Sequence, residues 1–244
     1  MFDFFKQPKL VIPDGMSKEA YQAEQNSFMT KVYAWMCSGL LVTALVSYVL
    51  YLQDSYIDFL ADNGWFIWVN MGISLALVFA ISWATRSRRV NSAVAAGLFF
   101  LYASVVGSFF ATIFVVYAAT SIASVFIGTA GSFAALSLYG YTTKRDLSIF
   151  GTIAYMALVG LIIAMFLNIF IFDSNSMSYI TAIIGVPIFA VLTAYDTQRI
   201  KASNIIGNAG TDEDRKEAIS GALNLYLDFI NLFIDLLRIF GDTK

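Results

Sequence analysis

The sequence contains no histidine, and only one cysteine and three prolines, in 244 residues. Without histidine, the chain cannot form a Ser-His or Cys-His nucleophile pair, an imidazole metal site or histidine ligation of haem. The single cysteine, Cys37, excludes an internal disulfide, and its place in an apolar run predicts that its side chain is packed. We expect no enzymatic activity and no resident cofactor.

Charged residues are also scarce, at 13% of the chain against about 25% in soluble domains. The 15 Lys and Arg residues stand against 17 Asp and Glu, so the basic face that a nucleic-acid partner needs is missing. Because 59% of the residues are hydrophobic, the composition predicts an integral membrane protein whose main partner is the lipid bilayer. Residues 1–30 are polar and lack the apolar core of a signal peptide, which predicts a cytoplasmic N-terminal tail.

Charge-free intervals long enough for a spanning helix of about 20 residues occur throughout residues 31–241. The interval between Arg89 and Lys144 is too long for one crossing, so it is expected to fold back near residues 118–121. The sequence therefore predicts an all-α protein whose domain 31–241 has seven transmembrane helices: 32–52, 65–85, two between Arg89 and Lys144, 147–172, 174–195 and 219–240.

Basic residues predict the orientation of these helices. If the N-terminus is cytoplasmic and seven helices alternate, every Lys and Arg except Arg238 and Lys244 falls on the cytoplasmic side. The outer loops then carry only acidic charge. The bias predicts a cytoplasmic N-terminus, and an external C-terminus if the seventh helix crosses.

Small residues four apart predict close helix contacts in the third and fourth spans, because lipid provides no hydrophobic force between helices. The two stripes are Ala103, Gly107, Ala111 and Ser124, Gly128, Ser132. Pro187 is expected to kink the sixth span or to free a backbone carbonyl there.

The last span carries polar residues on one stripe of the helix: Asn224, Asp228, Asn231, Asp235 and Arg238. Each Asp at mid-bilayer costs at least about 2.5 kcal/mol unless it meets water, a proton or a partner, so the stripe is expected to face the bundle interior. Two interpretations stay open. The helix lies at the membrane interface with Asp235 and Arg238 as a simple pair, or it lines a path for ions or protons.

Asp196 is a second carboxylate in an apolar setting, at the cytoplasmic end of the sixth span. Its position at a helix C-terminus requires a compensating partner, and Arg199, Arg86 and Asp228 are the alternatives. If Asp196 and Asp228 approach each other, they cannot both ionise cheaply and share a proton over part of the pH range. Carboxylate oxygens are also ligands that Ca²⁺ prefers, so the pair could be a pH-dependent gate, a calcium site or both.

Three segments together resemble the Bax inhibitor family, the transmembrane Bax-inhibitor-motif proteins, in its bacterial branch. They are residues 128–148 (GTAGSFAALSLYGYTTKRDLS), 195–200 (YDTQRI) and 225–233 (LYLDFINLF). The resemblance implies a bundle whose seventh helix is central and surrounded by the other six, located in the bacterial inner membrane. It also implies calcium leak, with Asp196 and Asp228 as a pH-sensing pair and Arg86 as the nearest match to a latch on that pair.

The first functional hypothesis is therefore a pH-gated leak channel or transporter for a cation, with calcium as the expected cation. The alternative is a regulatory membrane protein that binds a membrane protease or stress-response partner and transports nothing. An intramembrane aspartyl protease is disfavoured, because Asp228 follows Leu225-Tyr226-Leu227 rather than the Gly-x-Gly of those enzymes.

Overall fold

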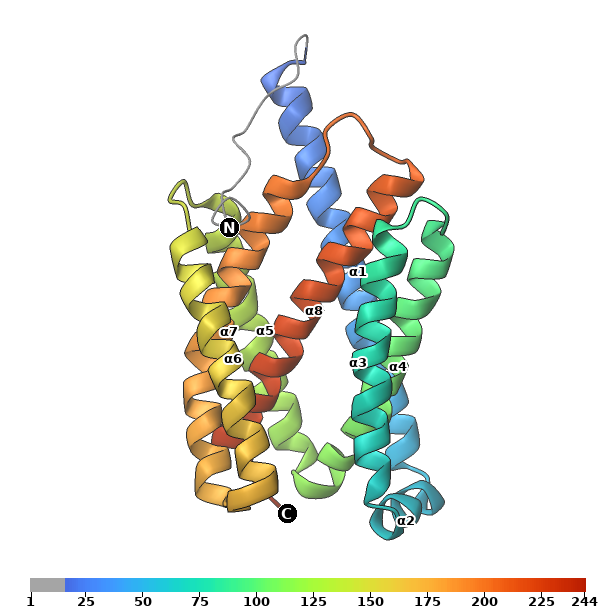
Figure 1. The fold of residues 1–244 in the computed structure, drawn as a ribbon, viewed down its shortest axis with the longest axis vertical. Helices are drawn as coiled ribbons and strands as arrows, with labels where there is room; N and C mark the ends of the chain where they lie inside the picture. Colours follow the sequence, from blue (N-terminus) through green and yellow to red (C-terminus); the bar gives the residue numbers. More distant parts are fainter. Residues whose placement is uncertain (1–15) are drawn as a thin grey trace. The chain divides into compact units, whose positions relative to one another are not determined.

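The computed structural model describes residues 16–244 and has an all-α fold. Its helices in chain order are α1 (Lys18–Tyr51), α2 (Asp54–Asp62), α3 (Trp65–Arg86), α4 (Ser92–Val116), α5 (Ala119–Thr142), α6 (Ser148–Leu167), the π-helical turn η2 (Asn168–Phe172), α7 (Asn175–Ser203) and α8 (Asp212–Phe240) (Figure 1).

Six helices in the described part of the chain are long and apolar enough to cross a membrane: α1, α3, α4, α5, α6 with η2, and α7. On α6, Ile149, Phe150 and Ile153 are exposed, as expected of side chains that face lipid. The all-α membrane class is confirmed. The charged residues of α8 interrupt its apolar sequence, so the seventh crossing stays a prediction.

Several boundaries agree with the sequence and others do not. The turn expected near residues 118–121 is confirmed, because α4 ends at Val116 and α5 begins at Ala119. Helix α1 begins at Lys18, inside the segment predicted as a tail (1–30), and residues 1–15 of that tail lie outside the described residues. The short α2 was not predicted, and Cys37 is exposed rather than packed.

The chain forms two compact units. The α5–α7 unit contains Ala119–Ser203 and Leu227–Asp242, and the α1–α4 unit contains residues 16–118, Asn204–Tyr226 and Thr243–Lys244. Helix α8 therefore contributes its first half, up to Tyr226, to one unit and its second half to the other.

In the α1–α4 unit, α4 packs against both α1 and α3. Gly107 permits the close approach to α1, since a Cβ there would lie only 2.8 Å from the backbone oxygen of Thr43. Ala103 and Ala111 are also buried, so close packing along this stripe is confirmed. The ring of Tyr226, from α8, contacts Phe99 on α4.

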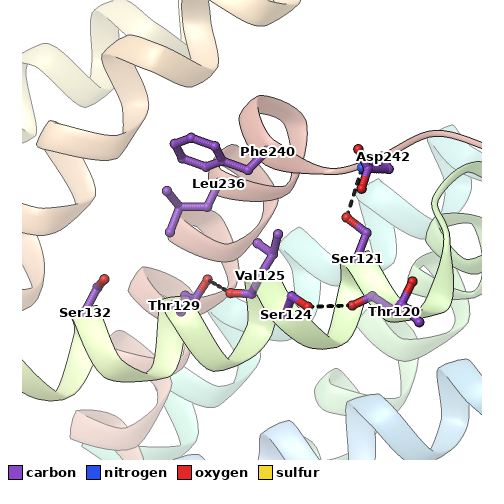
Figure 2. Close-up of a pocket in the computed structure, with 10 residues that line it drawn as sticks. Thr120, Ser121, Ser124, Val125, Thr129, Ser132, Leu236, Phe240 and Asp242 are labelled. Carbon is purple, nitrogen blue, oxygen red and sulfur yellow. Dashed lines mark hydrogen bonds between the residues drawn. The ribbon is translucent and has the colours of Figure 1, made fainter.

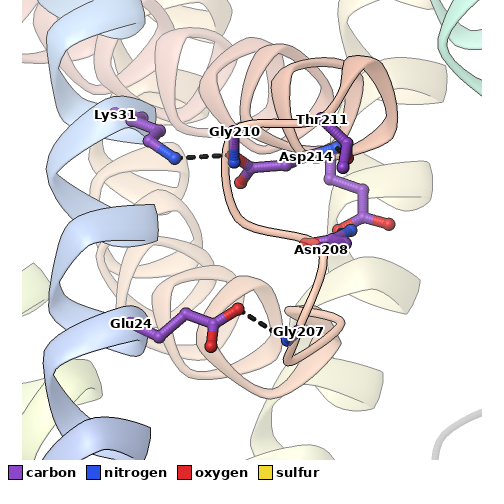
Figure 3. Close-up of polar contacts among 8 residues, drawn as sticks. Glu24, Lys31, Gly207, Asn208, Gly210, Thr211 and Asp214 are labelled. Atoms are coloured by element: carbon purple, nitrogen blue, oxygen red, sulfur yellow. Dashed lines mark hydrogen bonds and ion pairs between the residues drawn. The ribbon is translucent and has the colours of Figure 1, made fainter.

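The connection between α7 and α8 is held to α1 by polar contacts (Figure 3). The Glu24 carboxylate accepts a hydrogen bond from the Gly207 N–H at 2.6 Å, and the Lys31 ammonium pairs with Asp214 at 2.5 Å. Thr211 caps α8 by accepting a hydrogen bond from the Asp214 N–H at 3.2 Å. These contacts determine where α8 begins.

In the α5–α7 unit, α7 packs against both α5 and α6. Its aliphatic core joins three helices, with Leu161 from α6, Leu192 from α7 and Leu232 from α8. Pro187 lies inside α7, and the helix continues on both sides of it.

Candidate functional site

Glycines on α5 and α6 allow the C-terminal part of α7 to lie close to both helices. A Cβ at Gly140 would overlap the carbonyl of Ala194, and one at Gly151 would overlap the ring of Tyr195. Gly140 thus contacts the backbone of Ala194, and Gly151 contacts the side-chain ring of Tyr195. The two residues before Asp196 are therefore packed against α5 and α6, which positions this carboxylate.

Hydrogen bonds near the same end of α7 also attach this helix to α5 and to the loop before α6. The hydroxyls of Ser137 and Thr197 lie 2.9 Å apart, joining α5 to α7. The side chain of Gln198 accepts from the Leu147 N–H at 3.0 Å and donates to the Arg145 carbonyl at 2.8 Å. The loop that leads into α6 is thus attached to α7 beside Asp196.

Asp196 is buried, at 3% exposure, and its partner is a phenol. The Tyr155 hydroxyl, on α6, lies 3.0 Å and 2.9 Å from its two carboxylate oxygens and donates to them. Arg199 lies near enough to interact electrostatically, but among the described residues it forms no ion pair with Asp196. Of the alternatives left open by the sequence, the structure therefore excludes a simple Asp196–Arg199 pair.

Asp228, in the second half of α8, is the other member of the site. Its side chain is 5% exposed, and its Oδ2 is buried without a hydrogen-bond partner. Asp196 and Asp228 interact electrostatically, so a negative charge on one opposes a negative charge on the other. The structure thus brings together the two carboxylates that the sequence singled out.

The oxygen atoms of this pair determine what it can bind. Two carboxylates with a phenol beside them can hold one shared proton or contribute oxygens to a cation. Within residues 16–244, no group of three or more acidic, histidine or cysteine side chains could hold a metal ion. A Ca²⁺ ion takes six to eight oxygens. Water and backbone carbonyls would therefore supply most of its ligands at this pair.

The other stripe residues of α8 lie in different surroundings. Asp235 is buried, at 7% exposure, and Asn231 donates from Nδ2 to the Leu227 carbonyl at 2.8 Å. Asn224 is half-buried in the α1–α4 unit, and Arg238 is exposed. The interior stripe expected from the sequence thus includes both aspartates and excludes the arginine.

The small-residue stripe of α5 does not pack against a helix, which corrects the sequence prediction. Gly128 has open space where a Cβ would lie, and it lines a cavity of about 500 Å³ together with Ser124 and Ser132. Leu236 and Phe240 of α8 form another wall, as Figure 2 shows. Spacing alone could not distinguish packing from a cavity, because small residues suit both.

Most of the chain is similar to other bacterial proteins. The family model described as inhibitor of apoptosis-promoting Bax1 matches residues 25–244. The chain belongs to the Bax inhibitor family. The inner membrane protein YbhL of Escherichia coli K12 is 43% identical over 224 residues, covering 91% of this chain and 94% of that protein. An uncharacterized protein of Borreliella burgdorferi is 37% identical over 220 residues, covering 90% and 94%. The resemblance inferred from the three sequence segments is thereby confirmed.

Arg86, the residue nearest to the latch implied by the family, is the last residue of α3 and is exposed. It belongs to the α1–α4 unit, whereas Asp196 and Asp228 belong to the α5–α7 unit. The latch therefore stays a prediction for this Bax inhibitor family member.

Sequence reasoning missed Tyr155, which contacts Asp196 directly. The available signal was a phenol inside an otherwise apolar span, because a buried tyrosine hydroxyl usually has a hydrogen-bond partner. Gly151, four residues earlier on α6, was missed in the same way. Which residues of α7 Tyr155 and Gly151 contact depends on how α6 is rotated about its axis relative to α7.

Proposed function

We propose that this protein is a pH-sensitive leak channel or transporter for a cation, with calcium as the cation and Asp196 and Asp228 as the gating pair. It is a membrane transport protein and not an enzyme. The observation that carries the proposal is the burial of two interacting carboxylates, one of which has an oxygen without a partner. Such groups in a membrane protein are costly and usually mark ion or proton paths.

The gating step follows from the charge of the pair. When both carboxylates are ionised, they repel each other, so α7 and the second half of α8 are pushed apart at this level. A shared proton or a bound cation removes the repulsion and favours the close arrangement. Since Tyr155 holds only Asp196, Asp228 is the member free to change its contacts.

The proposal includes a topology. Helix α8 is the seventh span and the central one, surrounded by the other six helices, as membership of the Bax inhibitor family favours. The N-terminus is cytoplasmic and the C-terminus is external, as the distribution of basic residues favours. The relative named as an inner membrane protein supports the inner membrane of a bacterium as the location.

The test is calcium flux into liposomes that contain the purified protein and an internal calcium indicator. Wild-type flux is expected to change with external pH, because protonation changes the charge of the pair. Asp196→Asn and Asp228→Asn each leave a single carboxylate, so both variants should lose most of this pH dependence. Tyr155→Phe keeps both carboxylates and should displace the pH profile without abolishing it.

The matched control is Asp173→Asn, which removes one negative charge from the loop before α7 and leaves the pair intact. Asp173 has a positive φ of 43°, a conformation that Asn also accepts. A pH profile that stays the same in both pair variants would refute the gating role. Wild-type liposomes with no flux above protein-free liposomes would refute transport and leave the regulatory alternative, which co-purification of a membrane protease or stress-response partner would then test.

A further inference from the structure

A cavity of about 500 Å³ lies between the first half of α5 and the C-terminal end of α8, within the α5–α7 unit (Figure 2). Neither member of the Asp196–Asp228 pair lines it, so it is a separate site. Pockets that bind small ligands have volumes of about 300–1,000 Å³, so the cavity is large enough to hold one. Ser124 and Ser132, which line it, are exposed, so the cavity opens at the surface of the unit.

The two walls of the cavity differ in chemistry. Leu236 and Phe240 of α8 form an apolar wall, and hydroxyl side chains of α5 point toward it from the opposite side (Figure 2). The hydroxyls of Ser124 and Thr129 donate to backbone carbonyls four residues earlier, both at 2.8 Å. Each hydroxyl has a single proton, which is thereby used. These two groups can therefore accept a hydrogen bond or contact hydrocarbon without losing the bond that they already have.

The cavity runs inward from the beginning of α5, a helix long and apolar enough to cross a membrane. Its lining begins at Thr120, in the first turn of that helix, and extends to Ser132. At 1.5 Å per residue, these two positions are about 18 Å apart along the helix axis. The hydrocarbon core of a bilayer is about 30 Å thick, so one leaflet contributes about 15 Å. The cavity therefore has the length of one leaflet, with its Thr120 end at the level of the lipid headgroups.

Asp242 is the charged residue that lines the cavity, and it lies at the headgroup end. Its backbone N–H donates to Ser121 Oγ at 2.9 Å, which holds the segment after α8 against the first turn of α5. Within residues 16–244, the Asp242 carboxylate forms no ion pair. The ammonium of Lys244, two residues later, donates instead to the Phe114 carbonyl and the Tyr51 hydroxyl. The headgroup end thus presents a negative charge to a ligand, which favours a cationic donor.

We propose that this cavity binds one phospholipid molecule whose headgroup carries a primary ammonium group. One acyl chain lies along Leu236 and Phe240, and the ammonium donates hydrogen bonds to the Asp242 carboxylate. Water or a small cation would suit the carboxylate but would leave the apolar wall without a partner. A phospholipid of this kind matches the apolar wall, the charge and the length of the cavity together. The site goes beyond the proposed function, because it does not depend on ion transport.

The test is native mass spectrometry of the full-length protein in detergent, with phosphatidylethanolamine or phosphatidylcholine of the same acyl chains added after removal of bound lipid. The trimethylammonium group of phosphatidylcholine has the same charge but no proton to donate. We expect the wild type to retain one phosphatidylethanolamine and to bind it about tenfold more tightly than phosphatidylcholine, as for one hydrogen bond to a charged group. Asp242→Asn should lose most of this preference. Asp173→Asn, which removes the same charge from the exposed loop before α7, should retain it.

A second pair of variants tests the cavity itself. Gly128 and Gly131 both have open space where a Cβ would lie, but only Gly128 lines the cavity. Gly128→Leu should therefore abolish retention of phosphatidylethanolamine, and Gly131→Leu should leave it unchanged, with similar Tm in both variants.

The position of the lipid is measured with phosphatidylethanolamine that carries a photoreactive group in one acyl chain. We expect it to label the peptide that contains Leu236 and Phe240. No lipid retained by the wild type, equal binding of the two lipids, or equal retention in the two leucine variants would overturn the site. Labelling confined to other helices would do the same, and none of these results bears on the Asp196–Asp228 pair.

Discussion

The hydroxyl of Tyr226 connects three helices of the α1–α4 unit. Thr43 Oγ1, on α1, lies 2.9 Å from the Ala103 carbonyl on α4 and 2.6 Å from the Tyr226 hydroxyl on α8. A threonine hydroxyl has one proton, which it donates to the Ala103 carbonyl, so Tyr226 must be the donor in the second bond. Thr43 and Tyr226 are both buried, at 3% and 0% exposure.

The direction of this bond predicts an asymmetry between two substitutions. Tyr226→Phe removes the donor and leaves Thr43 bonded to Ala103, so we expect it to cost about 0.5–1.5 kcal/mol. Thr43→Val keeps the shape but leaves the Tyr226 hydroxyl buried without an acceptor, which costs about 1–3 kcal/mol. Hydrogen bonds between membrane helices average near the lower end of such ranges, at about 0.6 kcal/mol.

The assay is thermal unfolding of the purified protein in one detergent. For a chain of this size, 1 kcal/mol corresponds to a Tm change of about 2–4 °C. Thr43→Val should lower Tm more than Tyr226→Phe, and the double variant should be less destabilised than the sum of the two. A larger effect of Tyr226→Phe would refute the assigned direction of the bond, and strictly additive effects would refute the bond itself.

Two further predictions concern the start of α8 and the packing of α7. The pKa of Asp212 is lowered by its hydrogen bond to the Lys216 ammonium, so its contribution to stability is present above about pH 4 and declines as the pH falls further. Tm should therefore fall more in acid for the wild type than for Asp212→Asn, and parallel curves would contradict this. Gly140→Val should cost about 1–3 kcal/mol by forcing α5 from the backbone of α7, seen as a lower Tm. Gly128→Ala, which enters open space, should change Tm little, and an equal loss in both variants would argue against the assigned contact.

Some features of the fold follow from the chain alone. The intervals without charge predicted the turn between α4 and α5 and the membrane class, because an unpaired charge in lipid is costly wherever the helix faces. The same cost predicted that Asp196 and Asp228 face away from lipid and need a partner, a proton or water. The beginning of α1 at Lys18 escaped prediction, since its first turns are polar and are held by a tertiary contact, that of Glu24 with the Gly207 N–H.

Other features depend on how the helices are rotated against one another. The stripe at Ala103 packs against α1, whereas the similar stripe at Ser124 lines a cavity. The choice of Tyr155 rather than Arg199 as the partner of Asp196 depends on the face that α6 presents to α7. Composition and spacing determined which residues cannot face lipid, because transfer of a charge into hydrocarbon is a property of the side chain itself. Only the tertiary structure decided which group each of them meets, because a hydrogen bond requires two atoms within about 3 Å of each other.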